Sequence, residues 1–574
     1  MEPIYNSVVK FLGNDQQFTI PIFQRNYSWK EEQCRELFDD IIAVGDSSDE
    51  TYFLGTIVHI DGEYKTIPTY RVFDGQQRLT TLTLLLAALA KYLKENTVEG
   101  LSITSKNIIN KYLINRDEER DLKYRIKLNA PDNETLQYII DYTISEQEID
   151  ISDYKGSESI KNNFNYFLKR INQENAKILF EGFKKLHLIA IKLGHSDNPQ
   201  LIFASLNYKG LKLSAPDLIR NYVLMGLTPN EQDEIYENYW FKMEQSFSNN
   251  IKGYNFKSFL KDYLTTKENK IPSLTNLYKE FIRYSYDFFS EYPSKNNFEK
   301  MKGLVKDIYK YFNYVEKIFS SEEKDSDLKF SFENIYRLKI DVITPFILRL
   351  YDDYENKLLK KDECLNMINI TESYLFRRKT CNMNSQGLKT IFAKIYNKLN
   401  KQHYYDSYQE LLYKEDGETR FPKNREFGDT FIKTNFYKKK YLCKYALDRL
   451  ENFGHEKELT NTDKLTIEHI MPQNSDLSDE WQKDLGYDWR DIQEKYLHTI
   501  GNLTLTGYNQ KYSDLSFKEK RDMKNGFKDS SIRLNKPLAE MDTWNENQIT
   551  KRASDLRKEA NKIWPYLNVQ KHWK

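Results

Sequence analysis

A histidine, a glutamate and two asparagines near the C-terminal end of this 574-residue chain are residue types that can cut phosphodiester bonds with one metal ion. Glu468 and His469 are adjacent, and Asn502 and Asn509 follow them. A neutral histidine can activate water near physiological pH, and carboxylate or amide oxygens suit Mg²⁺. We expect His469 to act as the general base and Asn502 to hold the loop that orients it.

The candidate metal ligands are three residues, and the choice among them is open. Asn509 follows the second expected strand, and Glu468 and Asp514 are further oxygen donors. We expect Asn509, with Glu468 or Asp514, to bind Mg²⁺ or Mn²⁺. His498 is a second histidine, which could pack on the core or contact a phosphate. Taken singly, such residues are more often structural, since asparagines commonly cap turns.

A second group, Asp74-Gly75-Gln76-Gln77-Arg78, stands far from the first and suits a phosphate. A strand is expected before Gly75 and a helix after it. Free N–H groups at a helix N-terminus attract anions, and Arg78 can donate two parallel hydrogen bonds to a phosphate. Asp74 could hold a metal ion or orient water. An ordinary helix start is the alternative, and because no G-x-x-x-x-G-K-[S/T] motif occurs, an NTPase here is not of the P-loop type.

Two further segments could add to this phosphate site. In residues 20–29, polar side chains could donate to phosphates and a tyrosine could stack on a base, although burial is the commoner use of tyrosine. In residues 203–222, polar side chains could complete the nucleotide site or only brace it, and bracing is favoured. The cofactor-binding candidates of these segments are Gln24, Arg25, Tyr27, Asn207, Asp217 and Arg220. Those of the glycine turn are Asp74, Gly75, Gln76, Gln77 and Arg78.

The spacing of apolar residues predicts the elements that position both groups. Strands are expected at 18–22, 53–60, 70–73, 465–470 and 497–506. A helix should begin near Gln76, and the chain from about 100 to 430 should be mainly helical, with a polar link to the last domain at 415–430. Ser214 should cap one later helix, and Ser516 with Glu519 fits a capping box that begins another.

Composition limits the class of protein. The chain has 86 basic and 85 acidic residues, so it does not coat polyanions generically, although a local basic face could still bind nucleic acid. The four cysteines lie far apart without a C-x-x-C pair, which excludes a four-cysteine zinc ribbon and predicts free thiols. No signal peptide is evident, and the apolar run from Leu82 to Ala90 is too short to span a bilayer. We therefore expect a cytoplasmic protein with no membrane partner.

Five strings along the chain resemble the GmrSD family of type IV, modification-dependent restriction enzymes. They are IPIFQRNYSW, VFDGQQRLTTL, IFASLNYKGLKLSAPDLIRNY, IEHIMPQN and IGNLTLTGYNQKYSDLSFKEK. The resemblance implies an N-terminal ParB/sulfiredoxin-like domain that binds or hydrolyses a nucleoside triphosphate, and a C-terminal HNH, or ββα-metal, endonuclease domain. Relatives cut phage DNA with modified cytosine, or depend on a phosphorothioate backbone. The family often has asparagine where Asp514 stands, which leaves the metal ligand in doubt.

The sequence thus predicts an α+β, multidomain chain with a nucleotide-binding domain at 1–230, a helical region at 231–425 and an HNH domain at 426–574. Its predicted function is nucleotide-regulated, modification-dependent cleavage of duplex DNA in antiphage defence. The alternatives are a DNA-modification sensor or docking module that hydrolyses no nucleotide, and an RNA-directed nuclease or toxin. The modification, the choice among GTP, UTP, CTP and ATP, and partnership with a second copy or other defence proteins stay open.

Overall fold

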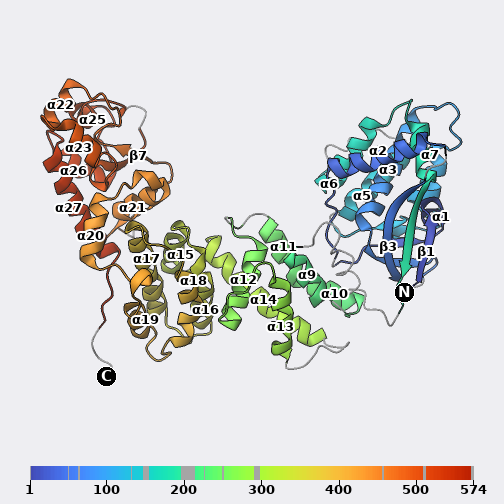
Figure 1. Ribbon diagram of the computed structural model, residues 1–574, viewed down its shortest axis with the longest axis horizontal. Helices are drawn as coiled ribbons and strands as arrows, with labels where there is room; N and C mark the ends of the chain where they lie inside the picture. Colours follow the sequence, from blue (N-terminus) through green and yellow to red (C-terminus); the bar gives the residue numbers. More distant parts are fainter. Residues whose placement is uncertain are drawn as a thin grey trace. The chain divides into compact units, whose positions relative to one another are not determined.

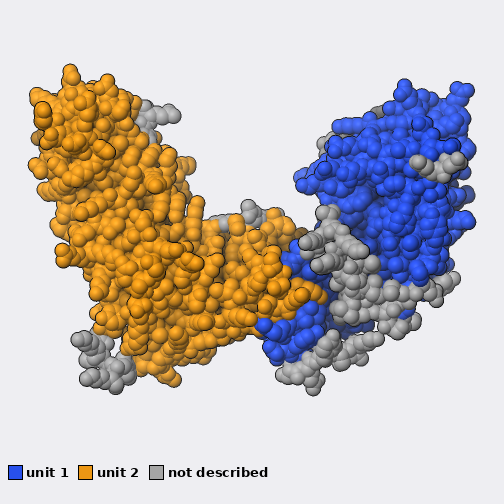
Figure 2. All heavy atoms as spheres, viewed as in Figure 1, with its two compact units in different colours: residues 1–242, 281–305 blue, residues 243–280, 306–574 orange. Residues whose placement is uncertain are grey.

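The computed structural model describes residues 2–22, 24–48, 51–62, 65–130, 132–145, 154–194, 214–224, 226–248, 251, 253–289, 298–455, 458–508 and 512–569. The chain divides into two compact units, coloured separately in Figure 2: Met1–Lys242 with Phe281–Val305, and Met243–Glu280 with Lys306–Lys574. Each unit contains helices and one sheet, so the predicted α+β class is confirmed. The finer division at 230 and 425 stays a prediction.

The sheet of the first unit has six strands in the order β1-β6-β3-β4-β2-β5. Three pairs are parallel (β6–β3, β4–β2 and β2–β5), and two are antiparallel (β1–β6 and β3–β4). The strands are β1 (Glu2–Ser7), β2 (Gln17–Thr19), β3 (Tyr52–Asp61), β4 (Thr69–Asp74), β5 (Ile126–Lys127) and β6 (Leu186–Lys192). The predictions for β3 and β4 are confirmed, and the first predicted strand is shorter and starts earlier.

The prediction that residues 100–430 are mainly helical is confirmed, and β6 is a strand within this range that the prediction did not include. Buried and half-buried residues alternate along this strand, as expected when one face covers a core. It lies between β1 and β3 in the sheet, so it is supported by distant strands. Pairing with sequence-distant strands is a tertiary effect that local periodicity does not report.

Helix α3 (Gln76–Glu95) is the central helix of the first unit and begins where predicted. Every residue from Leu79 to Ala90 is buried, because neighbouring helices enclose it. These neighbours are α4 (Ser105–Ile108), α5 (Asp132–Ile144) and α6 (Glu158–Arg170), and α2 (Glu31–Asp46) packs on α7 (Ala176–Lys184). Figure 1 labels α3 together with α2, α5, α6 and α7. The N-terminal sheet and these helices thus hold the turn at Gly75 against a rigid core.

Helices dominate the middle of the chain, as predicted. They are α9 (Ala215–Val223), α10 (Pro229–Ile235), α11 (Phe241–Ser248), α12 (Phe256–Glu268), α13 (Leu277–Phe289), α14 (Phe298–Phe319), α15 (Ser326–Arg337), α16 (Thr344–Glu355), α17 (Lys361–Thr380), α18 (Leu388–Lys394), α19 (Tyr404–Tyr413) and α20 (Asn424–Lys433). The polar stretch predicted as a link is bonded to α17: Arg377 donates to the Pro422 carbonyl at 3.0 Å and Arg378 to the Arg420 carbonyl at 3.1 Å.

The last part of the second unit contains a two-stranded antiparallel sheet between helices. β7 (Thr466–His469) pairs with β8 (Leu503–Thr506), and α25 (Phe517–Asp522) follows with the predicted Ser516–Glu519 capping box. The predicted second strand is shorter than expected, because residues 500–502 form a 3₁₀ turn. The remaining helices are α21 (Lys440–Asn452), α22 (Asp479–Leu485), α23 (Trp489–Tyr496), α26 (Lys536–Ala539) and α27 (Glu546–Ile563).

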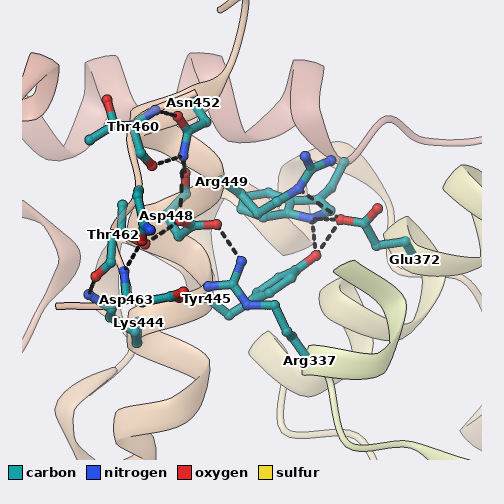
Figure 3. A network of polar contacts seen from close by, with 12 residues as sticks. Arg337, Glu372, Lys444, Tyr445, Asp448, Arg449, Asn452, Thr460, Thr462 and Asp463 are labelled. Atoms are coloured by element: carbon teal, nitrogen blue, oxygen red, sulfur yellow. Dashed lines mark hydrogen bonds and ion pairs between the residues drawn. The ribbon is translucent and has the colours of Figure 1, made fainter. Parts of the chain in front are cut away.

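A buried polar network joins this last part to the helices before it (Figure 3). Glu372 of α17 accepts hydrogen bonds from Tyr445 Oη, from Arg449 Nε at 3.0 Å and from Trp564 Nε1 at 3.3 Å. Beside it, Arg337 of α15 forms an ion pair with Asp448 of α21. Because α21 leads toward β7, these contacts anchor the C-terminal sheet to the helical region.

Removing one hydroxyl from this network should measurably destabilise the second unit. We expect Tyr445→Phe to lower the free energy of unfolding by about 1.5–3 kcal/mol, since Glu372 loses a donor while buried. Urea denaturation followed by circular dichroism measures the change. The exposed Tyr413→Phe is the matched control, and a change of less than about 0.5 kcal/mol, typical of surface sites, is expected there. Equal stability of the two variants would contradict the prediction.

One expectation of composition is confirmed by the structure. The cysteines are free thiols: Cys34, Cys364 and Cys443 are buried, and Cys381 is half-buried. None of the helices in the described part of the chain combines the length and apolarity that a membrane crossing requires.

Candidate functional site

The DGQQR segment forms the predicted strand-to-helix turn. Gly75 has φ +91° between β4 and α3, and a Cβ there would lie 2.8 Å from Ile57 Cγ1. Glycine is therefore required for both backbone conformation and space. Among the described residues no side chain caps the start of α3, so this end of the helix is suited to an anion.

Arg78 lies against a second glycine that the sequence analysis missed. Gly55 has φ +115° at an irregularity in β3, and a Cβ there would lie 1.8 Å from Arg78 Nη1. Arg78 donates to the Leu54 carbonyl at 3.0 Å and lies 3.4 Å from the Asp74 carboxylate. Because Gly55 has no side chain, the Arg78 guanidinium fits between β3 and the glycine turn.

Arg25 and α9 bring further charges to the turn. Burial lowers the pKa of Arg25, against the opposing effect of Asp217 and Asp74 nearby. Burial also raises the pKa of Asp74, opposed by Arg78, the Gly75 N–H and Arg25. Asp217 of α9 lies 3.0 Å from Arg220, and Ser214 caps that helix as predicted. The structure therefore gathers three predicted arginines and two predicted aspartates in one place.

The predicted amides brace the backbone around this charged cluster. Gln24 donates to the Phe73 carbonyl at 3.0 Å, and Gln76 donates to the Arg25 carbonyl at 3.2 Å. Gln77 accepts from the Ser28 N–H at 2.8 Å and donates to the Asn26 carbonyl at 3.3 Å. These side chains hold residues 24–28 against α3, so their polar groups face protein atoms.

Tyr27 is part of the core as the structure places it. Its hydroxyl hydrogen-bonds Thr81 at 2.6 Å and accepts from Asn163 at 3.1 Å, and its ring is buried. Because the Tyr27 ring is buried, a base cannot stack on it. Burial is also the commoner use of tyrosine. Asn207 lies outside the described residues.

In the C-terminal sheet, Glu468 and His469 point to opposite faces because they are neighbours in β7. The Glu468 carboxylate lies 2.7 Å from Lys520 Nζ of α25, and both side chains are buried. Lys520 also donates to the carbonyls of His469 at 2.9 Å and Ile470 at 3.2 Å. This ion pair holds the end of β7 against α25. The Glu468 carboxylate, a predicted metal ligand, is therefore already paired with Lys520.

His469 lies in a cluster with two aromatic rings. Its Nε2 is 3.0 Å from Nδ1 of His498, and the Tyr437 ring meets it edge-on at 4.5 Å. Tyr437 also stacks on His498 at 5.4 Å with an interplanar angle of 8°. His469 is only 4% exposed, whereas His498 is half-buried. His498 is therefore the member of the pair that meets solvent.

Asn502 holds the chain just after His469. Its carbonyl oxygen accepts from the Met471 N–H at 2.8 Å and from Trp544 Nε1 at 3.0 Å. Its amide donates to the carbonyls of Met471 at 3.1 Å and Leu497 at 3.0 Å. The side chain is fully buried and bonded on both ends, so it joins the segments that carry His469 and His498.

The donor set for a metal ion is incomplete in the described part of the chain. No group of three or more His, Cys, Asp or Glu side chains gathers there. Asp514 is exposed, and its carboxylate accepts a hydrogen bond from the Asn474 amide at 3.3 Å. Burial lowers the pKa of Lys520 and the negative charge of Asp514 opposes this shift, so Asp514 lies near the lysine that binds the end of β7. Asn509 lies outside the described residues. Asp514 is thus a carboxylate near this site that faces solvent.

Family comparisons match both parts of the chain that carry these clusters. Residues 8–224 match the model described as the N-terminal domain of GmrSD restriction endonucleases, and residues 421–559 match the model for the C-terminal domain. The chain belongs to the GmrSD family of restriction endonucleases. A comparison with curated proteins finds no match.

The GmrSD C-terminal match spans the histidine pair and Lys520. In the sequence, Tyr437 and Lys520 stand in basic runs whose lysines could contact backbone phosphates or could equally lie on a solvated helix face, and the role of His498 is open. The structure instead buries Lys520 in the ion pair with Glu468. Nothing in the local sequence marks Lys520 as buried. Only the packed structure shows which of these side chains meet.

The surroundings of His469 keep its ring neutral. Burial first, and then the positive charges of His498, Lys520 and Lys440, lower its pKa to about 3. Burial lowers the pKa of His498 as well. A general base must start in this neutral form, although its basicity falls as its pKa falls below the working pH.

We expect the His469 resonance of ¹³C-histidine-labelled protein to titrate well below pH 5 in the folded chain and near 6.5 in urea. The unfolded chain then binds the extra proton between pH 6.5 and about 3. The stability that the folded chain gains from keeping His469 neutral is therefore complete above pH 6.5, and it is lost as the pH falls toward 3. His469→Ala assigns the signal, and a folded midpoint near 6.5 would contradict the burial argument.

Proposed function

We propose that this chain is a nucleotide-regulated, modification-dependent DNA endonuclease of antiphage defence. The observation that carries the proposal is the contact between His469 and His498, fixed by Asn502 and Lys520 in the region that matches the GmrSD C-terminal domain. A strand pair followed by a capped helix supports the HNH, or ββα-metal, assignment of that region.

In this proposal His469 is the general base for water. It takes a proton from the water that attacks the scissile phosphorus, and its bond to His498 gives that proton a path to a ring that meets solvent. The sugar oxygen leaves the phosphorus with the bonding electron pair and takes up a proton from solvent. Asn502 and Lys520 do not touch the substrate but hold the two segments that carry the rings.

Asp514 and Asn509 are the proposed holders of Mg²⁺ or Mn²⁺. A bound divalent ion would neutralise charge on the phosphate and on the leaving oxygen. Asp514 faces solvent, and amide oxygens such as that of Asn509 are hard ligands of the kind Mg²⁺ prefers. Glu468 could join them only by leaving Lys520, so its proposed role is to position β7.

The proposed nucleotide site is the charged cluster around Gly75. The uncapped start of α3, Arg25 and Arg78 offer donors to phosphates, and Asp74 can orient water or a metal ion. Arg220 and Asp217 support this cluster from α9. Gln24, Gln76, Gln77 and Tyr27 act by bracing it.

We expect Arg78→Ala to weaken nucleotide binding about 10- to 100-fold, the loss of one charge-assisted contact to a phosphate. Isothermal titration with GTP, UTP, CTP and ATP measures the change. Arg35, an exposed arginine of α2 in the same unit, provides the control Arg35→Ala, which should bind as the unaltered chain does. Equal affinity of the two variants would remove Arg78 from the site.

Cleavage of a substrate panel tests the proposed function as a whole. The panel contains unmodified, glucosylated and phosphorothioated duplex DNA and single-stranded RNA, each with Mg²⁺ and each of the four nucleotides. We expect cutting of one modified DNA and a dependence on nucleotide. Preferential cutting of RNA would favour the RNA-directed alternative, and binding of modified DNA without cutting would favour a sensor.

A further inference from the structure

The second unit contains a cationic cavity that lies largely outside both family matches. Its volume is about 670 Å³, and it is bordered by α12, the end of α17, α18 and the turn before α21. Its basic lining residues are Lys261, Lys339, Arg378, Lys379, Lys389 and Lys439. The acidic ones are Asp262 and Asp341, so positive charge is in clear excess.

Much of this positive charge is available to a ligand. Asp262 is buried and already bonded to Tyr254 at 2.7 Å and Lys261 at 3.0 Å. Lys339 and Lys379 flank the ring of Tyr441, at 5.0 and 5.2 Å from its centroid. Within the described part of the chain, neither lysine forms an ion pair with a carboxylate. The cavity therefore presents ammonium groups held by an aromatic ring instead of by opposite charges.

Two features of the lining suit a nucleic-acid strand. Arg378 is buried at the cavity, and its Nε has no hydrogen-bond partner in the described residues. Ile271 and Leu274 line the same cavity with 37% and 47% of their surfaces exposed, so apolar surface lies beside the basic groups. Ammonium groups can contact phosphates of any sequence, and apolar side chains can contact sugars or bases.

One short turn joins this cavity to the histidine pair. Residues Tyr437–Lys439 form a 3₁₀ turn in which Lys439 lines the cavity and donates to Asn382 at 3.2 Å. Tyr437 of the same turn contacts both His469 and His498. The preceding Phe436 N–H donates to the His498 carbonyl at 3.0 Å. A strand bound in the cavity would thus be next to the turn that covers the proposed catalytic rings.

We propose that this cavity binds the phosphodiester backbone of the DNA substrate and leads the strand toward the histidine pair. The inference rests on the proposed action of the chain on DNA. It assigns a substrate-binding role to the helical region, which neither family match covers between residues 225 and 420. A free nucleoside triphosphate has the same phosphate chemistry, so the experiment separates the two sources.

The test uses the full chain in EDTA, where binding is measured without cutting. The variant Lys339→Ala/Lys389→Ala/Lys439→Ala removes three exposed lysines of the cavity. By fluorescence anisotropy with a labelled modified duplex, we expect affinity to fall about tenfold or more at physiological salt. The slope of log affinity against log salt should become shallower by about 2–3, because each lost phosphate contact removes about 0.9.

The matched control Lys394→Ala/Lys398→Ala/Lys433→Ala removes the same charge from exposed sites of the same unit outside the cavity. It should keep the original affinity and salt slope. Equal DNA binding by both triple variants would overturn the proposal. So would a cavity variant that keeps its affinity for DNA but no longer binds a fluorescent nucleoside triphosphate. His469→Ala separates the two claims: normal binding without cutting supports the nuclease site, and normal cutting removes that site while leaving the cavity result intact.

Discussion

His469→Ala should lower the rate of DNA cleavage by about 10²–10⁴-fold, the usual effect of removing a general base. The ring lies 3.0 Å from His498 and is held neutral by burial, so its deletion removes the group that takes the proton from water. Nucleotide turnover should be unchanged, because the charged cluster at Gly75 belongs to the other unit. Single-turnover cleavage with Mg²⁺ and a parallel phosphate-release assay measure both activities.

The control for this change is His455→Ala, which removes an exposed histidine of the same unit. Cleavage by this variant should stay within about twofold of the unaltered chain, as expected for a surface site away from the chemistry. Thermal denaturation shows whether either variant has lost its fold. Wild-type cutting by folded His469→Ala would end the assignment of the base.

Lys520→Met should be the most destabilising of the substitutions considered. It leaves the Glu468 carboxylate buried, with 3% of its surface exposed, without its cation. Breaking a buried pair in this way costs about 3–5 kcal/mol of unfolding free energy. The backbone at the end of β7 also loses the donors to the His469 and Ile470 carbonyls, so cleavage should fall with stability.

A double-mutant cycle separates the charge from the packing. In Glu468→Leu/Lys520→Met both charges are replaced by apolar groups, and stability should recover to within about 1–2 kcal/mol of the unaltered chain. Lys518→Met, at an exposed site on the same helix, is the control for the lysine-to-methionine change. If the double variant loses the sum of the two single losses, the pair is not coupled as the 2.7 Å contact implies.

The double variant also bears on the metal ligands. If Glu468 positions β7 and does not hold Mg²⁺, a folded double variant should keep the Mg²⁺ dependence of the unaltered chain, even if its cleavage rate falls with the loss of the Lys520 bonds to the His469 and Ile470 carbonyls. If its Mg²⁺ requirement rises by an order of magnitude or more while the fold is intact, Glu468 is a ligand and must leave Lys520 when the ion binds. Asp514→Asn, compared at the same Mg²⁺ concentrations, tests the other carboxylate near the site.

Local sequence determined several parts of this protein. In the N-terminal turn, β-rich residues predict the strand and leucines at helical spacing predict the helix. The glycine between them allows the positive φ that the turn requires. Ser214 and Ser516 begin their helices because their hydroxyls and a carboxylate three residues later satisfy free N–H groups. The family could also be recognised from the strings around these elements. Such features depend on neighbours in the chain, so the sequence alone indicates them.

Tertiary structure decided what each candidate side chain touches. Tyr27 became a core residue, Glu468 met Lys520, and β6 formed between distant strands. The charged cluster at Gly75, the histidine pair and the cationic cavity each join residues that are remote in sequence. Hydrogen bonds, ion pairs and burial act over a few ångströms in space, whereas sequence periodicity reports only the local backbone. The fold alone therefore determines which polar groups are used within the protein and which remain for a ligand.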